Sequence, residues 1–389
     1  MSPVDRRLGL LDLPPELLIN IIEDLRSEWT YTAKERQTDL ARIALVHPIL
    51  NAVAREMLYG GDVTARSAGR THLLSRSLVS NPSLSGLVRS LSFRCEMDSG
   101  HVDSLITILQ VCTETLESLT LSAVYLKSAR AELYTALQAT SLRSFSYGFH
   151  GIESDLDPIV PLLTSFRNLK ELVLDRVAAI PPGAAPSAHR VKRGLRLWGA
   201  PPTYALESIS ITNWHNIDAV GWPLEMLDWL FGSTKASLKS LHLCELSSAA
   251  PLGAICDLLA DRSCHSSLEK LTVRDFRDGH SLEPRPLDPN SFATIFPNLT
   301  HLSLMTNADE SSFHTPKPHL VLPARLRVLQ VDDDLFLTWR LLETVQAASA
   351  PATLRRIRLR GPFPSDIDVK ALKRACERKG VACEVLRPF

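Results

Sequence analysis

The sequence predicts an α/β protein in which three short helices precede a long array of strand–helix units. An apolar hexamer recurs ten times between residues 88 and 359, and its copies start at nearly regular intervals. Stretches with helical periodicity separate the copies. The first 60 residues lack the hexamer and carry apolar stripes at helical spacing instead. We therefore expect a small helical domain at residues 8–60 and a repeat solenoid at residues 61–389.

The first helix is expected to begin at Pro15. Leu13 and Pro14 each precede a proline and are pushed toward extended conformations. Pro15 suits the first helical position, where its missing N–H has no partner to lose, and Glu16 places a negative charge near the positive end of the helix dipole. Apolar side chains then form one wide stripe, made of Leu17, Leu18, Ile21, Ile22 and Leu25.

Two more helices are expected before residue 60. Thr38 or Asp39 is a good N-cap for the second helix. Pro48 ends this helix, because the residue before a proline disfavours helical geometry. Three short helices bury only a small core, so they need a neighbour or a partner. The apolar residues of these two helices are Leu40, Ile43, Ala44 and Val46, then Ile49, Leu50, Val53, Met57 and Leu58.

The opening Leu13-Pro14-Pro15-Glu16-Leu17 and the later apolar run 40–46 resemble the F-box, in the style of the F-box domain-containing proteins of filamentous fungi. F-boxes bind the Skp-type adaptor of cullin–RING ubiquitin ligases. The alternative is that the three helices only cap the solenoid, as terminal units of repeat arrays do. The resemblance implies an adaptor-binding face formed or supported by Leu13, Pro14, Glu16, Leu17, Ile21, Leu25, Leu45, Val46, Pro48 and Ile49.

The repeated hexamer has apolar residues at its first, fourth and sixth positions. Nine of its ten copies begin with Leu, and successive copies start 26 to 37 residues apart. This is the L-x-x-L-x-L core of a leucine-rich repeat. The repeats are degenerate, because the Asn or Cys that usually follows the strand is mostly missing. The copies begin at Val88, Leu116, Leu142, Leu169, Leu206, Leu238, Leu268, Leu299, Leu326 and Leu354.

Helical stretches between the hexamers complete each unit, so we expect about ten to twelve repeats with a curved parallel sheet inside and helices outside. Residues 62–79 resemble an atypical first repeat, and residues 366–386 predict a last helix and a closing strand. A segment rich in Pro, Gly and Ala near 177–205 predicts an insertion loop, either functional or disordered. The predicted helices are 101–112, 129–139, 157–165, 224–231, 252–261, 290–295 and 335–347.

The residues between the leucines of each strand are expected to face away from the helices, because side chains alternate along a strand. Arg356, Arg358 and Arg360 alternate in one strand and should project together, which suits a carboxylate or phosphate. They could instead pair with the acidic run 332–334, or form a solvated surface. Aromatic residues that follow several strands either bind a partner or pack the loops. We expect target-binding residues among Trp214, His242, Arg274, His301, Arg356, Arg358 and Arg360.

Composition and motifs narrow the function. Lys plus Arg equals Asp plus Glu, at 43 each, so net charge gives no attraction to nucleic acid or an acidic membrane. Seven scattered cysteines without C-x-x-C favour a reducing compartment, cytoplasmic and/or nuclear. Nucleotide-binding, zinc-protease and hydrolase motifs are missing. We therefore expect no enzyme, no metal, no cofactor, and no nucleic-acid or membrane partner.

An F-box followed by leucine-rich repeats is the layout of a substrate-recognition subunit. The resemblance implies that the helical domain binds the Skp-type adaptor and, through it, a cullin–RING ubiquitin ligase. The repeats then hold a target protein, whose identity the sequence does not reveal. The alternative function is a non-catalytic repeat scaffold whose N-terminal helices only cap the solenoid.

Overall fold

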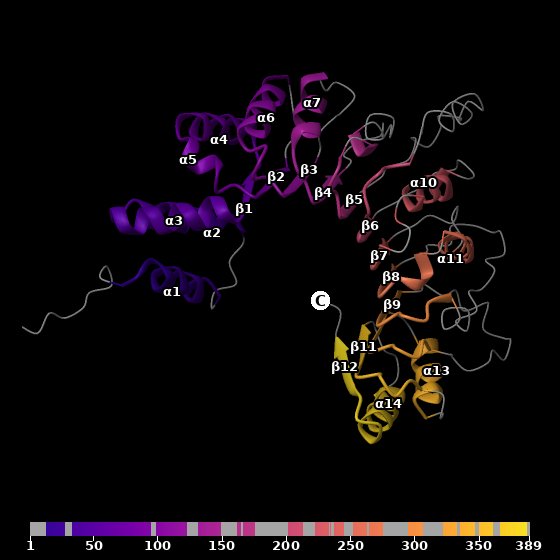
Figure 1. Cartoon of the computed structure of the whole chain (residues 1–389). Helices are drawn as coiled ribbons and strands as arrows, with labels where there is room; N and C mark the ends of the chain where they lie inside the picture. The colour runs from indigo at the N-terminus through magenta and orange to yellow at the C-terminus, as the bar shows by residue number, and fades with distance from the viewer. Residues whose placement is uncertain are drawn as a thin grey trace, which may run out of the picture. The chain divides into compact units, whose positions relative to one another are not determined.

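The protein is an α/β protein in which strands and helices alternate (Figure 1). Twelve described strands are all parallel, and their order in the sheet follows the chain from β1 to β12. This arrangement is consistent with a repeat solenoid. The computed structural model describes residues 13–27, 33–94, 99–122, 131–148, 162–164, 166–175, 201–212, 222–232, 234, 237–244, 252–262, 264–274, 295–305, 322–332, 335–346, 350–360 and 366–386.

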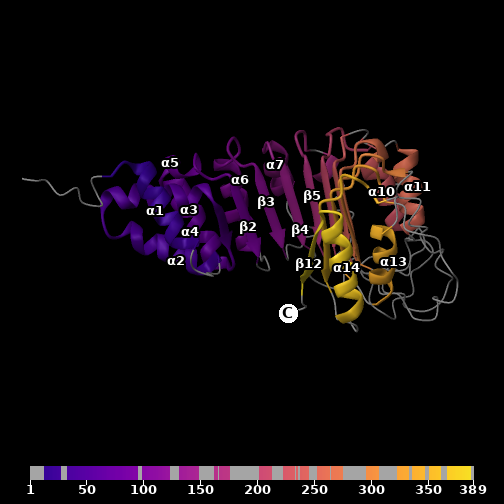
Figure 2. The same cartoon turned by 90° about the horizontal axis from the view of Figure 1, so that it is seen from below.

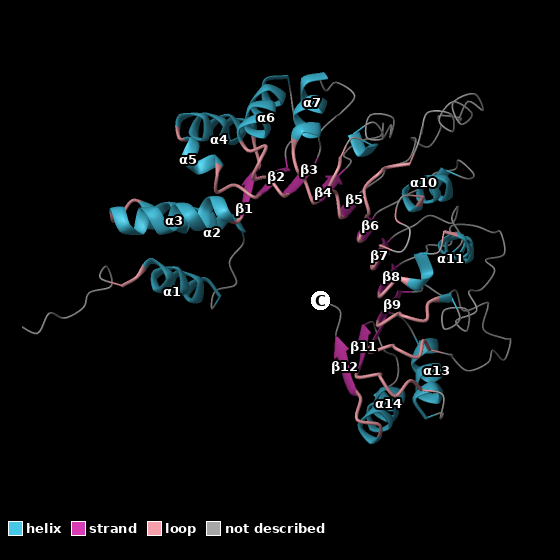
Figure 3. Cartoon of the chain, viewed as in Figure 1, coloured by secondary structure: helices cyan, strands magenta, loops and turns pink. Residues whose placement is uncertain are grey.

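The chain divides into two compact units, Met1–Leu142 and Arg143–Phe389. The first unit opens with three helices and continues with strands that alternate with helices (Figure 3). Its elements are α1 (Pro15–Ser27), α2 (Ala33–Ala44), α3 (Pro48–Gly60), β1 (Asp62–Ala65), α4 (Ala68–Ser80), α5 (Pro82–Ser85), β2 (Ser90–Arg94), α6 (Ser99–Val111), β3 (Ser118–Ser122) and α7 (Ala131–Ala139).

In the second unit the strands follow a curve, and the helices lie on its outer side (Figure 1). Figure 2 shows the last helix running beside the last strand, against which it packs. The elements are β4 (Ser144–Gly148), β5 (Glu171–Asp175), β6 (Ser208–Thr212), α10 (Trp222–Phe231), β7 (Ser240–Cys244), α11 (Leu252–Asp261), η3 (Cys264–Ser266), β8 (Lys270–Arg274), β9 (His301–Met305), β10 (Val328–Asp332), α13 (Leu335–Gln346), β11 (Arg356–Arg360), α14 (Asp366–Arg378) and β12 (Ala382–Leu386).

The repeated hexamer places all ten strands from β2 to β11. Each of these strands begins two residues after the start of a hexamer copy. In the copy around β3, Leu116, Leu119 and Leu121 are all buried. The residue ahead of a strand also continues the ladder, as where the Glu117 N–H donates to the Arg89 carbonyl at 2.8 Å. The apolar positions of the hexamer therefore form the interior between strands and helices.

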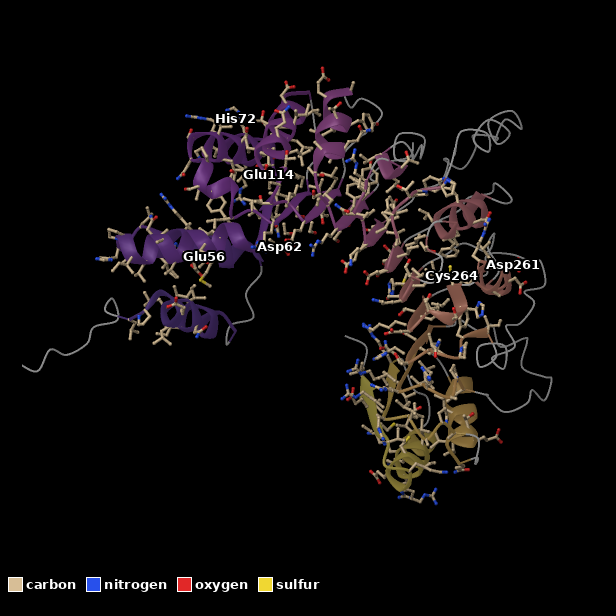
Figure 4. All side chains as sticks on the ribbon, viewed as in Figure 1. Glu56, Asp62, His72, Glu114, Asp261 and Cys264 are labelled. Atoms are coloured by element: carbon tan, nitrogen blue, oxygen red, sulfur yellow. The ribbon has the colours of Figure 1, made fainter. Side chains whose placement is uncertain are left out.

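Buried polar contacts also join neighbouring repeats. The Cys264 thiol, whose side chain is labelled in Figure 4, is fully buried and lies 3.4 Å from the Thr234 hydroxyl. Burial raises the pKa of the Cys264 thiol. The Ser267 hydroxyl donates to the Leu238 carbonyl of the preceding repeat at 2.9 Å. The Ser267 contact satisfies a backbone carbonyl at the turn that leads into β7.

Most predicted helices appear close to their expected positions, and one boundary is wrong. The second helix begins at Ala33, not at Thr38 or Asp39. The segment 33–37 consists of Ala, Lys, Glu, Arg and Gln, which all favour helix, so the helix continues past the two capping residues. The first helix begins at Pro15, as predicted. Most of the segment 177–205 and most of the predicted helices 157–165 and 290–295 lie outside the described residues.

The three N-terminal helices share one small core. Leu18 and Ile22 from α1 pack with Leu40 from α2 and with Leu50 and Val53 from α3. Helix α3 is the centre of this group, because it contacts both other helices. It also contacts β1 and α5, so it links the helical group to the first strand of the sheet.

Candidate functional site

The turn between α2 and α3 is held by hydrogen bonds on both sides. At its start, the N–H groups of Leu45 and Val46 donate to carbonyls three residues earlier, at 3.0 and 3.1 Å. Across the turn, the Asn51 side-chain amide donates to the Ala44 carbonyl at 2.8 Å. These hydrogen bonds therefore hold the backbone of Leu45 and Val46 in place, and the side chains of the two residues take no part in them.

His47 caps the start of α3. Its backbone is extended, with φ −155° and ψ 145°, and Pro48 occupies the first helical position. The His47 Nδ1 atom accepts a hydrogen bond from the Ile49 N–H at 3.2 Å. An N-cap acceptor satisfies an N–H that the helix leaves unpaired. This cap sets the direction in which α3 leaves the turn.

Large apolar side chains are exposed around this turn. Leu45 is 86% exposed and Val46 is 73% exposed, while Leu17 on α1 is 47% and Ile49 on α3 is 41% exposed. Eight large hydrophobic side chains are exposed within the described ranges, and these four lie in a stretch of only 33 residues. We call Leu17, Leu45, Val46 and Ile49 the apolar face. Such a concentration is typical of a surface that a partner covers.

The other residues predicted for adaptor binding fall into three groups. Pro14, Glu16 and Pro48 are exposed. Leu13 and Ile21 are half-buried, and Leu13 packs against the helical core. Leu13 is therefore part of the helical core more than of the apolar face. Leu25 lies in α1, but its side chain lies outside the described residues.

No protein-family model matches this sequence, and a comparison with curated proteins gives no match. In the part of the chain that the structure describes, no helix is both long and apolar enough to cross a membrane. The same residues contain no group of three or more His, Cys, Asp or Glu side chains that could hold a metal ion.

The sheet offers a second candidate surface on the side opposite the helices. Burial alternates along the strands, as in β6, where Ile209 and Ile211 are buried between half-buried Ser208, Ser210 and Thr212. We call the side with the less buried residues the open face. From β2 to β7 this face carries mainly serine and threonine, whereas from β8 to β12 it carries most of its described charged side chains, beside residues such as Thr272, Ser303 and Val328. The two ends of the face therefore suit different ligands.

The three arginines of β11 lie on the open face, and two of them share one carboxylate. Strand β12 places Glu384 opposite Arg358. The Glu384 carboxylate lies 3.1 Å from Arg356 Nε and 2.8 Å from Arg358 Nε, one oxygen to each. Arg360 is exposed and makes no ion pair with any described side chain.

The sequence did not single out Glu384 as a partner of these arginines. It suggested the acidic run 332–334 instead. Asp332 is the register neighbour of Arg360, but its side chain and residues 333–334 lie outside the described residues. Glu384 could have been found from the repeat phase of the closing strand at 381–386. Sequence reasoning also left Arg327 out of the site.

His301 lies on β9 inside a positive field. Burial lowers the pKa of its imidazole, and the nearby positive charges of Lys270, Arg327 and Arg358 lower it further. Glu269 acts in the opposite direction, with a smaller effect. The His301 Nδ1 atom lies 2.9 Å from the Thr300 hydroxyl. Basic side chains from the repeats of β8, β10 and β11 therefore all lie close enough to the His301 imidazole to lower its pKa.

The remaining predicted target-binding residues are less informative. His242 on β7 is half-buried, and its Nε2 atom lies 2.9 Å from the Cys244 sulfur on the same strand. Arg274 is the last residue of β8, opposite Cys244 in the register. The side chain of Arg274 and the whole of Trp214 lie outside the described residues.

A row of charged residues runs just ahead of the strands. Glu207 is bound by two lysines, with Lys170 Nζ at 2.6 Å and Lys239 Nζ at 2.9 Å. Hydrogen bonds from the lysine ammonium groups, together with their charge, lower the pKa of Glu207 to about 2. The row continues through Glu269 toward Arg327, where no described carboxylate pairs with the arginine. Charges in this row thus cancel in the middle of the unit but not near β10.

Proposed function

We propose that the protein is the substrate-recognition subunit of a cullin–RING ubiquitin ligase, which binds a Skp-type adaptor through its N-terminal helices. The observation that carries this proposal is the apolar face, whose Leu45 and Val46 are exposed at a hydrogen-bonded turn. Full burial of such a side chain contributes about 1.5–3 kcal/mol. Four of them, already fixed in position, can supply a substantial part of a binding free energy.

The repeats supply the second half of the proposed function. They present a long open face of polar side chains that can hold a target protein. In this mechanism the chain does no chemistry itself. It raises the effective concentration of target lysines near the ubiquitin-carrying enzyme, because adaptor and target are bound by one molecule.

The test is co-purification of the full chain with a Skp-type adaptor. Leu45→Asp is expected to abolish binding, because an aspartate at the centre of an apolar contact leaves an unpaired charge there. Its matched control is Leu73→Asp on α4, which is also exposed but lies outside the apolar face. The control should bind like the wild type. Thermal unfolding of both variants should match the wild type, because both side chains are exposed.

One observation favours the alternative, a repeat scaffold that the three helices merely cap. Helix α3 packs against β1 and α5 and so covers the start of the sheet. Capping by α3 does not explain the exposed side chains of α1 and of the α2–α3 turn. If a well-folded wild type fails to bind the adaptor, the scaffold function replaces the proposed one.

A further inference from the structure

Two cysteines meet inside the last repeat, where helix α14 packs against strand β12 (Figure 2). On α14, Cys376 is fully buried and lies one turn after the buried Leu372. On β12, Glu384 points to the open face, where its carboxylate binds two arginines. Side chains alternate along a strand, so the neighbouring Cys383 points to the opposite side, toward α14.

The turn between α14 and β12 brings the two thiols together. Gly380 has a φ of 68°, which glycine adopts without strain, and the Val381 N–H donates to the Cys376 carbonyl at 2.9 Å. The chain therefore reverses directly after the helix and returns along the side that carries Cys376. The Cys376 and Cys383 thiols are hydrogen-bonded to each other, and neither forms a disulfide. Two sulfur atoms in contact need only a small movement to become covalently bonded.

The two thiols differ in exposure and in acidity. Cys383 is half-buried, whereas Cys376 is fully buried. The hydrogen bond from Cys376 lowers the pKa of the Cys383 thiol, and the positive charge of Lys373 acts in the same direction. Burial and the carboxylates of Glu377 and Glu384 oppose this shift of the Cys383 pKa. The thiolate is the form that reacts with oxidants, so Cys383 reacts first and Cys376 second.

We propose that Cys376 and Cys383 form a reversible disulfide with hydrogen peroxide as the oxidant, and that this bond ties the last strand to the last helix. The Cys383 thiolate attacks a peroxide oxygen, so an S–O bond forms, the O–O bond breaks, and hydroxide leaves and is protonated to water. Cys376 then loses its proton and attacks the Cys383 sulfur, which forms the S–S bond and releases a second water. Two thiols and one peroxide give one disulfide and two waters. A thiol such as glutathione reverses the reaction, as for transient disulfides in reducing compartments.

The disulfide acts on an end strand of the sheet. Strand β12 is the last in the sheet order, and within the described residues it pairs only with β11. Terminal elements open more easily than interior ones. Strand β12 also carries Glu384, which binds Arg356 and Arg358. Oxidation therefore keeps this carboxylate on the two arginines and fixes the charge at this end of the open face. The inference goes beyond the proposed function and does not depend on it.

Mass spectrometry of the full-length protein tests the inference directly. After the reduced protein is treated with a small excess of hydrogen peroxide, its intact mass should fall by two hydrogen atoms. Trypsin cleaves after Arg378 and Lys379, between the two cysteines, so the disulfide should appear as two cross-linked peptides that separate on reduction. Cys112 is the internal control and should stay unmodified, because burial raises the pKa of its thiol to about 11. An unchanged mass, or disulfides that join other cysteines at random, contradicts the inference.

Variants separate the roles of the two thiols. Cys383→Ser should abolish the cross-link, while Cys376→Ser should leave Cys383 as a sulfenic acid that dimedone traps. Lys373→Gln should slow disulfide formation about twofold, because it removes a positive charge that favours the Cys383 thiolate. Its matched control is Lys370→Gln, an exposed lysine one turn earlier on α14, which should react like the wild type. The mass measurement on the wild type stands even where a serine variant fails to fold.

Hydrogen exchange measures what the disulfide does to the structure. The amides of Ala382–Leu386 should exchange about tenfold more slowly in the oxidised protein than in the reduced protein, and those of the interior strand β7 should not change. Equal exchange in both forms would overturn the claim that the bond ties β12 to α14. Oxidation of Cys264 as fast as that of Cys383 would show that the pair is not a preferred site. Neither result bears on the adaptor, because the Leu45→Asp experiment measures a surface in the first unit.

Discussion

The N-terminal helices and the strands of the second unit place their large apolar side chains differently. In the helices, Leu45 and Val46 are exposed although they adjoin a packed core. In the strands, apolar residues such as Leu271 and Ile357 are buried, and the open face is polar or charged. Three helices of 12 or 13 residues have too little interior for all their apolar side chains. The strands have enough interior for their apolar side chains, because each repeat inside the array packs against a neighbour on both sides.

Under the proposed function, this difference implies two kinds of partner contact in one chain. An apolar face binds through loss of water-exposed surface, which responds weakly to salt. The charged end of the open face, from β8 to β12, suits contacts through charge, which salt screens. Adaptor binding should therefore persist at salt concentrations that weaken contacts made by the charged end of the open face.

The largest expected effect is the loss of a buried ring from the sheet interior. Phe145 on β4 is fully buried, and its ring centroid lies 5.2 Å from that of Phe166. Phe145→Ala should lower the free energy of unfolding by about 3–5 kcal/mol, because it leaves a cavity. Urea unfolding measures this loss. Ser146→Ala, on the open face of the same strand, is the control and should change little. A loss below about 1 kcal/mol for Phe145→Ala would mean that the sheet interior is not tightly packed.

Two adjacent leucines of α1 allow a buried and an exposed apolar side chain to be compared within one helix. Leu18 is buried in the helical core, while Leu17 is half exposed on the apolar face. Leu18→Ala should cost about 2–4 kcal/mol of stability. Leu17→Ala should cost about 0.5 kcal/mol or less and weaken adaptor binding instead. Urea unfolding and co-purification of both variants separate the two effects. Equal stability losses would show that Leu17 is part of the core and not of a docking surface.

The strands were predictable from the sequence because their signal is local and repeated. Each hexamer buries the same three positions wherever the structure describes their side chains, so ten copies with similar spacing located ten strands. The start of α2 was not predictable from its caps, because the helix-forming residues ahead of Thr38 outweighed them. Helical boundaries depend on such competition, whereas the repeat pattern does not.

The candidate sites were predictable only in part. The α1 stripe includes both Leu17 and Leu18, and its spacing does not tell which of them the neighbouring helices cover. The contact of Glu384 with Arg356 and Arg358 depends on the register between β11 and β12, which joins residues 26 and 28 positions apart. Periodicity gives the face of a residue, but it does not give its partner on the next strand.

The smallest expected effect concerns the charged row, where Glu207 is bound by Lys170 and Lys239. Its pKa in the folded protein is lowered to about 2 from 4.5. A carboxyl group whose pKa is lower in the folded state stabilises the fold above its unfolded pKa, and this contribution is lost as pH falls toward the folded pKa. Glu207→Gln should therefore lower the melting temperature slightly at pH 7, and the difference from the wild type should shrink between pH 4.5 and pH 2. The effect is small because the three side chains are partly exposed and solvent screens their charges. Thermal unfolding at pH 7, 4 and 3 measures it. A difference that stays constant across these values would assign the stabilisation to packing of the Glu207 side chain and not to its charge.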